Sequence, residues 1–418
     1  MLLPPQQDPI LYTLVIALCG FGVVMVFSAS AVYARQTFGT TTYFLHRCLL
    51  WNLIGLAGMM LASRLDFSIY RRLVYPLLGL AVALLGAVLI VGVRINGARR
   101  WFHIAGVSFQ PAEMAKLALI IYLAYSLSRK ADKVRLFAVG FLPHLVVCGV
   151  IMLLLLKQPD LGTAVIAGGV TLMLLFIAGA KVSYLILAML AATPALYQAI
   201  VGTPWRMRRI LAFLDPWQFR YDVGYQITES LISVGSGGLT GLGLGDGKQK
   251  LFFLPEAHTD YIMAIVGEEL GFVGITAVAL AFCGVISCGF RAAWRARDAF
   301  GCYLAAGITS MLGLQAVINL GVVLGSLPTK GLPMPFVSFG GSSLVIDLWA
   351  VGMLLNISRG AAAPSSPRWG RLLLQLLGGA RSNRRRPGGG RRVRIETGVP
   401  TRPELAPNTV RSTTETPQ

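Results

Sequence analysis

Asp260, an aspartate followed directly by a long apolar segment, is the residue best placed to act as a base. It ends the sequence LPEAHTD (254–260), and the apolar segment 262–290 begins two residues later. If that segment crosses a membrane, the carboxylate lies where the loop enters the bilayer and is partly removed from water. It could then take a proton from a hydroxyl group. The alternative is an N-cap for the following helix, which is compatible with the first role.

Cations that could hold a phosphate-bearing ligand occur in several polar segments. Paired arginines precede Trp101, a combination that suits phosphate beside an apolar or sugar group, although it also suits anchoring at a membrane interface. Two lysines follow the closely spaced glycines of 241–245, and another lies in 327–343, where prolines and glycines exclude a regular helix. The candidate substrate-binding residues are Arg99, Arg100, Lys248, Lys250, Lys330 and the amide Gln226.

Ionisable residues also occur within predicted spans. Glu113 and Lys116 lie three residues apart on one helical face, just after Pro111, which suits a first helical turn. A Lys at the centre of a membrane helix costs about 2.5–3.5 kcal/mol, so the pair predicts a role, either functional or as a structural ion pair. Glu268 and Glu269, about two turns into the segment after the proposed base, are candidates to orient Lys116 or to line the same cavity.

The elements that would position these residues are membrane helices. The chain has 418 residues, of which 55% are hydrophobic and 13% charged, whereas soluble domains carry about 25% charged residues. Its longest apolar segments reach about 18 residues or more, enough to cross roughly 30 Å of hydrocarbon. We therefore predict an all-α polytopic membrane protein of about ten helices. The predicted spans are 10–33, 48–63, 73–93, 112–128, 136–156, 163–180 (with Asp160 as its N-cap), 183–201, 262–290, 300–325 and 341–358.

Positive charge predicts the orientation of these spans. One set of short loops carries eleven Lys and Arg and the opposite set seven, and the arginine-rich tail falls with the first set. Both termini are then cytoplasmic, and the long loop 202–261 is periplasmic. Its aromatic residues and glycines favour a functional loop over a disordered one. The chain divides into a transmembrane domain, 1–360, and a basic tail, 361–418, which is predicted to be disordered and could lie on anionic lipid headgroups.

Several other classes are disfavoured. The net charge of +19 would suit nucleic acid, but twelve of the 37 Lys and Arg lie from Arg359 onward and most others in short loops, which topology explains better. The six cysteines lie in or beside apolar segments without a CxxC pair, which argues against disulfides and a metal site. The initial MLLPPQQDP has no cation, which argues against a cleaved signal peptide.

Taken together, these motifs resemble the SEDS family (shape, elongation, division and sporulation), which includes FtsW, RodA and SpoVE. The resemblance covers roughly Leu11 to Arg359, and LPTKGLP and IVGEELG look more like the cell-division branch, FtsW, than RodA. Tyr261 stands where the family commonly has Phe, and Phe339 where it commonly has Tyr. The motifs that occur in family order are NGARRW, SFQPAEMAKL, QPDLGT, GYQITESL, LPEAHTDYI, GEELG and PTKGLPMPFVSFGGSS.

The resemblance implies an inverting peptidoglycan glycosyltransferase that polymerises lipid II into β-1,4-linked glycan strands, with Asp260 in the catalytic position. It also implies the bacterial inner membrane at the division septum, with a class B penicillin-binding transpeptidase and other divisome proteins as partners. Because the donor already carries a diphosphate leaving group, one base and several cations would suffice, without the second carboxyl group of glycoside hydrolases. No cofactor is certain, although a divalent cation could share the work of the cations.

Two other functional classes stay open on the sequence. A transporter that flips the same lipid would also combine polytopic helices, intramembrane Glu and Lys, and interrupted backbone, although no convincing inverted repeat is present. A non-catalytic scaffold for division proteins would leave the outward-facing charged residues unexplained. Polymerisation of lipid II by the purified chain distinguishes the enzyme from both.

Overall fold

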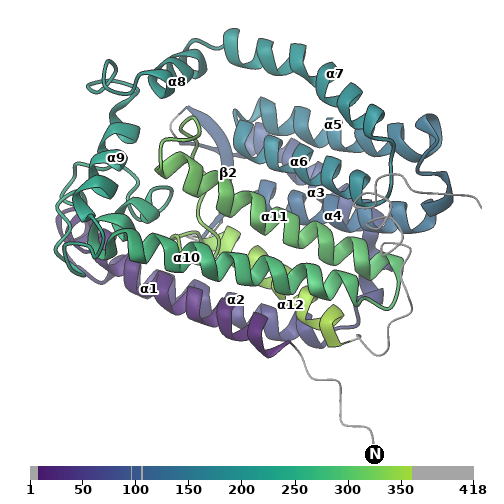
Figure 1. The fold of residues 1–418 in the computed structure, drawn as a ribbon, viewed down its shortest axis with the longest axis horizontal. Coiled ribbons are helices and arrows are strands. Elements are labelled where there is room, and N and C mark those ends of the chain that lie inside the picture. The colour runs from purple at the N-terminus through teal and green to yellow at the C-terminus, as the bar shows by residue number, and fades with distance from the viewer. Residues whose placement is uncertain (1–7, 96, 105–106, 360–418) are drawn as a thin grey trace, which may run out of the picture. The chain divides into compact units, whose positions relative to one another are not determined.

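Each of the ten predicted spans corresponds to a helix in the computed structural model, which describes residues 8–95, 97–104 and 107–359 (Figure 1). Eight of these helices are long and apolar enough to cross a membrane, and the other two are α4 and α6. The long loop contains two further helices, α8 (Pro204–Leu214) and α9 (Tyr225–Gly237). The ten helices are α1 (Pro9–Phe38), α2 (Tyr43–Arg64), α3 (Ser68–Val91), α4 (Pro111–Arg129), α5 (Leu142–Lys157, after a π-helical turn at Phe137–Phe141), α6 (Leu161–Ile177), α7 (Val182–Val201), α10 (Ile262–Trp294), α11 (Ala299–Val323) and α12 (Gly341–Arg359).

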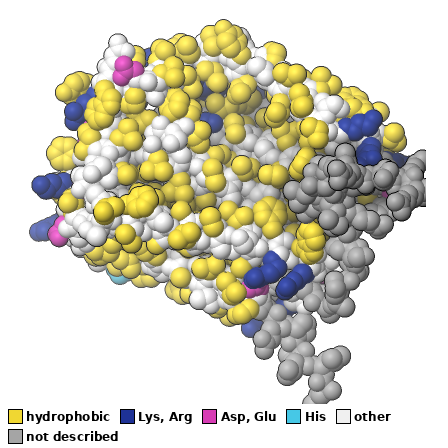
Figure 2. All heavy atoms as spheres, viewed as in Figure 1, with side chains coloured by type: hydrophobic (Ala, Val, Ile, Leu, Met, Phe, Trp, Pro, Cys, Tyr) yellow, Lys and Arg dark blue, Asp and Glu magenta, His cyan; other side chains and the backbone are white. Residues whose placement is uncertain are grey.

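The centre of the bundle is formed by α4 and α11, which are buried along most of their length. Around them, α3 and α6 pack on α4, α10 packs on α11, and α2 packs on α12. Outward-facing side chains are largely apolar, such as Ile90, Leu53 and Leu190, which are 77%, 66% and 63% exposed. Figure 2 shows hydrophobic side chains over most of one face, with Lys and Arg mainly near its edges. Such a surface requires lipid around it, and the protein is a polytopic α-helical membrane protein.

A small sheet lies between α3 and α4, where the sequence analysis predicted no strand. Strands β1 (Val93–Ile95), β2 (Ala98–Ile104) and β3 (Val107–Phe109) are antiparallel, in the order β1-β2-β3. Gly97, in the turn between β1 and β2, has φ 78°, a left-handed conformation that glycine adopts without strain. Because successive residues of a strand point to opposite faces, the neighbours Arg99 and Arg100 are directed apart.

The two ends of the described chain lie side by side. The backbone N–H of Asp8 donates to the hydroxyl of Ser358 at 3.3 Å, and Arg291 forms an ion pair with the Asp8 carboxylate at 2.6 Å. These contacts agree with an even number of spans, whereas the cytoplasmic side assigned to both ends stays a prediction. The predicted basic tail, 361–418, lies outside the described residues.

Candidate active site

A cavity of about 190 Å³ lies where segments distant in sequence meet. Its walls come from β2, the start of α6, the end of α7, helix α8 and the segment 328–331. Asp160 lies in this wall and also caps α6, because its carboxylate accepts from the Thr163 N–H at 3.1 Å and from the Thr163 hydroxyl at 2.8 Å. The predicted N-cap is thus confirmed.

Asp260 lies directly against the cavity wall. A Cβ atom added to Gly331, a wall residue, would come within 2.6 Å of Asp260 Oδ2, so the carboxylate occupies the space that a side chain would take. The backbone carbonyl of Asp260 accepts a hydrogen bond from Asn319 Nδ2 at 2.8 Å. The same amide nitrogen donates to the carbonyl oxygen of Leu332 at 2.7 Å. Asn319 of α11 therefore joins the backbone beside the base to the backbone of the segment 328–340.

The electrostatic surroundings of Asp260 suit a base. Burial, followed by the charge of Glu256, raises the pKa of this carboxyl to about 7, although Arg100 and Arg209 act in the opposite direction. A pKa near the working pH allows a group to accept a proton and release it again. The alternative role as an N-cap is not observed, because the cap position of α10 is Tyr261 and no side chain caps this helix.

Two of the predicted cations, Arg100 and Lys330, line the cavity. Arg100 donates from Nε to the Gln158 carbonyl at 3.0 Å, which ties β2 to the turn before α6. Burial lowers the pKa of Lys330, and Asp160 acts against this shift. Both cations thus lie at the wall against which the Asp260 carboxylate rests.

Two further cations of the wall, Arg206 and Arg209, were missed by the sequence analysis. Both guanidinium groups lie over the ring of Trp205, at 5.2 and 5.0 Å from its centroid. Burial lowers the pKa of each, and Arg100 lowers both further, so like charges converge on this space. Their three-residue spacing within PWRMRRILAFL is typical of one helical face, and this is the signal in the sequence that could have found them.

The remaining predicted cations lie elsewhere. Arg99 donates to the carbonyl oxygens of Leu89 and Ile90, both at 2.9 Å. Lys250 is buried in an ion pair with Glu269 at 2.7 Å, and Lys248 is exposed. Gln226 is half-buried on α9. None of these four predicted residues is among those that line the cavity.

The intramembrane carboxylates agree with the prediction at Glu113, where a structural ion pair was one alternative, and differ from it at Glu268 and Glu269. Glu113 and Lys116 form a buried ion pair at 2.8 Å. Glu268 and Glu269 do not orient Lys116; they contact the loop before the base instead, Glu268 through backbone N–H groups and Glu269 through Lys250. A second carboxylate near Lys116, the buried Asp347 of α12, was not predicted.

No group of three or more His, Cys, Asp or Glu side chains in the described part of the chain is arranged to hold a metal ion. The six cysteines are free thiols. A divalent cation that accompanies a diphosphate stays a prediction; Asp160 lines the cavity and Asp260 rests against its wall.

A family model described as "Cell cycle protein", covering FtsW, RodA and SpoVE, matches residues 9–362. The chain belongs to this family. A probable peptidoglycan glycosyltransferase FtsW of Geobacter sulfurreducens is 47% identical over 355 residues, which are 84% of this chain and 95% of the relative. The stage V sporulation protein E of Bacillus subtilis is 40% identical over 356 residues, which are 85% and 97% of the two chains.

Solved structures show the same fold. One matching chain comes from a structure that describes the "structural coordination of polymerization and crosslinking by a peptidoglycan synthase complex". It matches with a TM-score of 0.72 at 29% identity, over 86% of this chain and 99% of the other. The rod shape determining protein RodA of Thermus thermophilus matches with a TM-score of 0.64 at 29% identity, over 86% and 98% of the two chains. The helical arrangement that forms the cavity is therefore that of the family.

Proposed function

We propose that this chain is a peptidoglycan glycosyltransferase that polymerises lipid II into β-1,4-linked glycan strands, with Asp260 as general base. One observation carries the assignment: the Asp260 carboxylate rests against the wall of a cavity that four cations line. The names of the curated relatives support the reaction class. The cations are Arg100, Arg206, Arg209 and Lys330.

The reaction assigns one task to each side of the site. Asp260 takes the proton of the acceptor 4-hydroxyl as its oxygen bonds to the anomeric carbon of the donor, from the face opposite the leaving group. The bond from that carbon to the diphosphate breaks, and the diphosphate leaves with the electron pair. The cations stabilise the charge that develops on it, so no acid is needed to protonate the leaving group. The anomeric configuration is inverted in this single displacement.

The apolar part of the wall suits the lipid portion of the substrate. Leu161, Val165, Leu196 and Ile200 line the cavity beside the cations. A pocket that encloses a drug-sized ligand holds about 300–1,000 Å³, so a cavity of about 190 Å³ has room for a diphosphate and part of one sugar. The polyprenyl chain would lie along α7, which has no buried side chain of its own.

The direct test is polymerisation of lipid II by the purified chain, alone and with its transpeptidase. We expect Asp260→Asn to fold normally and to make no glycan strands. Asp246→Asn is the matched control, since Asp246 is an exposed aspartate of the same loop, and it should keep wild-type activity. Strand synthesis by Asp260→Asn at the wild-type rate would exclude the proposed base.

The setting is proposed on the same basis. The family branch supports the bacterial inner membrane at the division septum, and the synthase complex among the structural matches supports a class B penicillin-binding transpeptidase as partner. The other divisome proteins are proposed as partners from the family branch alone.

A lipid II flippase is the second candidate, because α10 is interrupted at Gly271 and a buried charged pair lies in α4. Translocation of lipid II in vesicles by the Asp260→Asn variant, without polymerisation, would favour it. A non-catalytic scaffold is the third candidate, and normal growth of an Asp260→Ala strain would favour that reading.

A further inference from the structure

Helix α10, which follows Asp260, is interrupted, and part of the loop before Asp260 fills the interruption. Gly271 of α10 has φ 64° and ψ −161°, so the helical hydrogen bonds stop there. The segment 238–243 replaces them: the N–H groups of Leu242 and Gly243 donate to the carbonyls of Glu268 and Glu269 at 3.0 and 3.1 Å. In return, the N–H groups of Phe272 and Val273 donate to carbonyls of 238–239 at 2.9 and 3.1 Å. The loop is therefore built into the helix.

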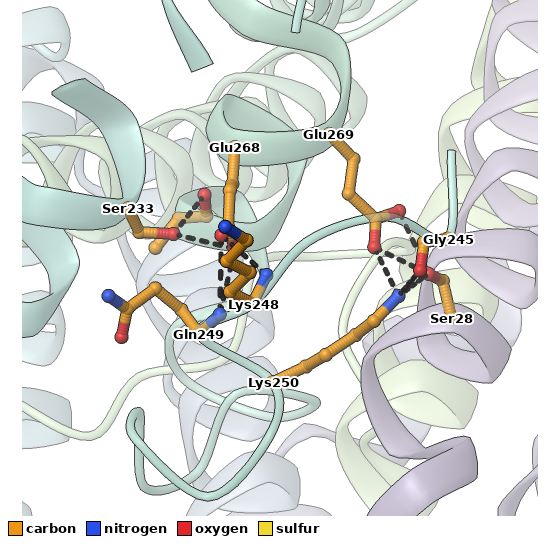
Figure 3. A network of polar contacts seen from close by, with 9 residues as sticks. Ser28, Ser233, Gly245, Lys248, Gln249, Lys250, Glu268 and Glu269 are labelled. Carbon is orange, nitrogen blue, oxygen red and sulfur yellow. Dashed lines mark hydrogen bonds and ion pairs between the residues drawn. The ribbon is translucent and has the colours of Figure 1, made fainter. Parts of the chain in front are cut away.

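The side chains of the same two glutamates hold the next part of the loop (Figure 3). Glu268 Oε1 accepts from the backbone N–H groups of Lys248 and Gln249 at 2.7 and 3.2 Å. Glu269 accepts from Lys250 Nζ at 2.7 Å and from the hydroxyl of Ser28 in α1 at 2.7 Å. Both glutamates are buried, at 1% and 0% exposure. We call Ser28, Lys250, Glu268 and Glu269 the loop latch.

The loop backbone packs closely against the two glutamates of the latch at Gly247 and Gly241. A Cβ atom on Gly247 would come within 2.9 Å of Glu268 Oε2 and 3.1 Å of Glu269 Oε1. A Cβ atom on Gly241, which has φ 84°, would come within 2.1 Å of the Glu269 carbonyl oxygen. The loop backbone thus rests directly on the two glutamates.

Lys250 has no donor left for a ligand. An ammonium group has three N–H donors, and its Nζ contacts Glu269 Oε1 at 2.7 Å, the Gly245 carbonyl at 2.6 Å and Ser28 Oγ at 3.1 Å. Binding a diphosphate would require breaking one of these buried bonds. The structure therefore separates Lys250 from the cations of the cavity wall.

The ion pair closes a loop with the base at its middle. Lys250 precedes Asp260 by ten residues and Glu269 follows it by nine. Joining the two ends removes conformational freedom from the residues between them. We propose that Lys250, Glu268 and Glu269 are positioning residues that fix the segment 251–260 and thereby hold the Asp260 carboxylate against Gly331. This inference rests on the proposed function.

The test compares two lysines of one loop. Lys250→Met removes the buried cation, and Lys248→Met, the matched control, removes an exposed cation whose only latch contact is through its backbone. In steady-state polymerisation of lipid II with purified protein in nanodiscs, we expect Lys250→Met to lower kcat at least tenfold with KM within twofold. Lys248→Met should leave both within twofold. Lys250→Arg, which keeps the charge, should recover most of kcat.

Hydrogen exchange provides a second measurement that needs no activity. We expect amides of 242–243 and 248–249 to exchange at least tenfold faster in Lys250→Met than in wild type, and at the wild-type rate in Lys248→Met. If Lys250→Met does not fold, Ser28→Ala removes one latch contact from α1 and should show the same two effects at smaller size.

The outcomes separate the latch from the proposed reaction. A raised KM with unchanged kcat and unchanged exchange would identify Lys250 as a substrate ligand and overturn the latch. Unchanged kcat and exchange would also overturn it. If the wild type makes no glycan, the proposed function fails, whereas faster exchange in Lys250→Met would still support the contacts of the latch.

Discussion

The cations of the cavity wall and the buried lysines of the bundle differ in what neutralises them. Lys116 and Lys250 each contact a glutamate, at 2.8 and 2.7 Å. Arg100 and Arg206, by contrast, donate to backbone carbonyls, and within the described part of the chain neither forms a salt bridge. A cation already paired with a carboxylate has little attraction left for a ligand. The comparison therefore teaches that the partner of a cation, rather than its sequence distance from the base, indicates its task.

The largest effect is expected from breaking a paired cation. Lys116→Met leaves the Glu113 carboxylate buried without its partner, and the free energy of unfolding should fall by about 3–5 kcal/mol. Thermal or denaturant unfolding in detergent measures it. The double variant Glu113→Gln/Lys116→Met should be clearly more stable than the single one, and equal losses would show that the pair is not the cause.

A cation of the wall should affect activity rather than stability. Arg209→Gln should lower kcat by about 10²–10³, because a charge that stabilises the leaving diphosphate is lost. Arg208→Gln is the matched control on the same helix, since Arg208 forms an exposed salt bridge with Asp222. Similar losses of activity in both variants would contradict the inference that Arg209, which lines the cavity, acts on the substrate and that Arg208 does not.

The raised pKa of Asp260 predicts a cost in stability. The folded state holds a proton up to a pKa of about 7, whereas an ordinary aspartate releases it near 3.8, so wild-type stability should fall as pH rises from about 4 to about 7. Asp260→Asn removes this fall and should be more stable than wild type at pH 8, by about 4 kcal/mol more than at pH 4. Melting curves at the two pH values measure it, with Asp246→Asn as control.

The smallest effect concerns the pH profile. The base must be deprotonated to act, so kcat/KM should rise with pH through about 7. Glu256→Gln removes a charge that raises the Asp260 pKa and should move this limb to lower pH by a few tenths of a unit. If kcat/KM of Glu256→Gln rises over the same pH range as that of the wild type, another group controls the profile.

The spans could be predicted well because burial in lipid needs only an apolar segment of sufficient length. The predicted span 262–290 corresponds to α10, Ile262–Trp294, and the predicted span 10–33 corresponds to α1, Pro9–Phe38. The sheet at 93–109 was missed because its strands are too short for a clear alternation. Helices α8 and α9 were missed because the region between two apolar segments was treated as one loop.

The site was predicted in part. Asp260, Arg100 and Lys330 come together at the cavity, although their functional roles stay predictions. Lys250 was predicted to join them as one of two lysines that follow the glycines of 241–245, but its partner, Glu269, lies beyond the base. Contacts across a closed loop depend on tertiary packing, and the sequence pattern contains no signal for them.

The hydrogen bonds of Asn319 have a mechanical consequence. One amide nitrogen binds the carbonyl next to the base and the carbonyl two residues after Lys330. A shift of α11 would therefore move the base and this cation together. Arg206 and Arg209 lie on α8, which comes from a different part of the chain and would not move with them. Movement of α11 relative to α8 would change the distance between the base and these two arginines, and so the size of substrate that fits between them.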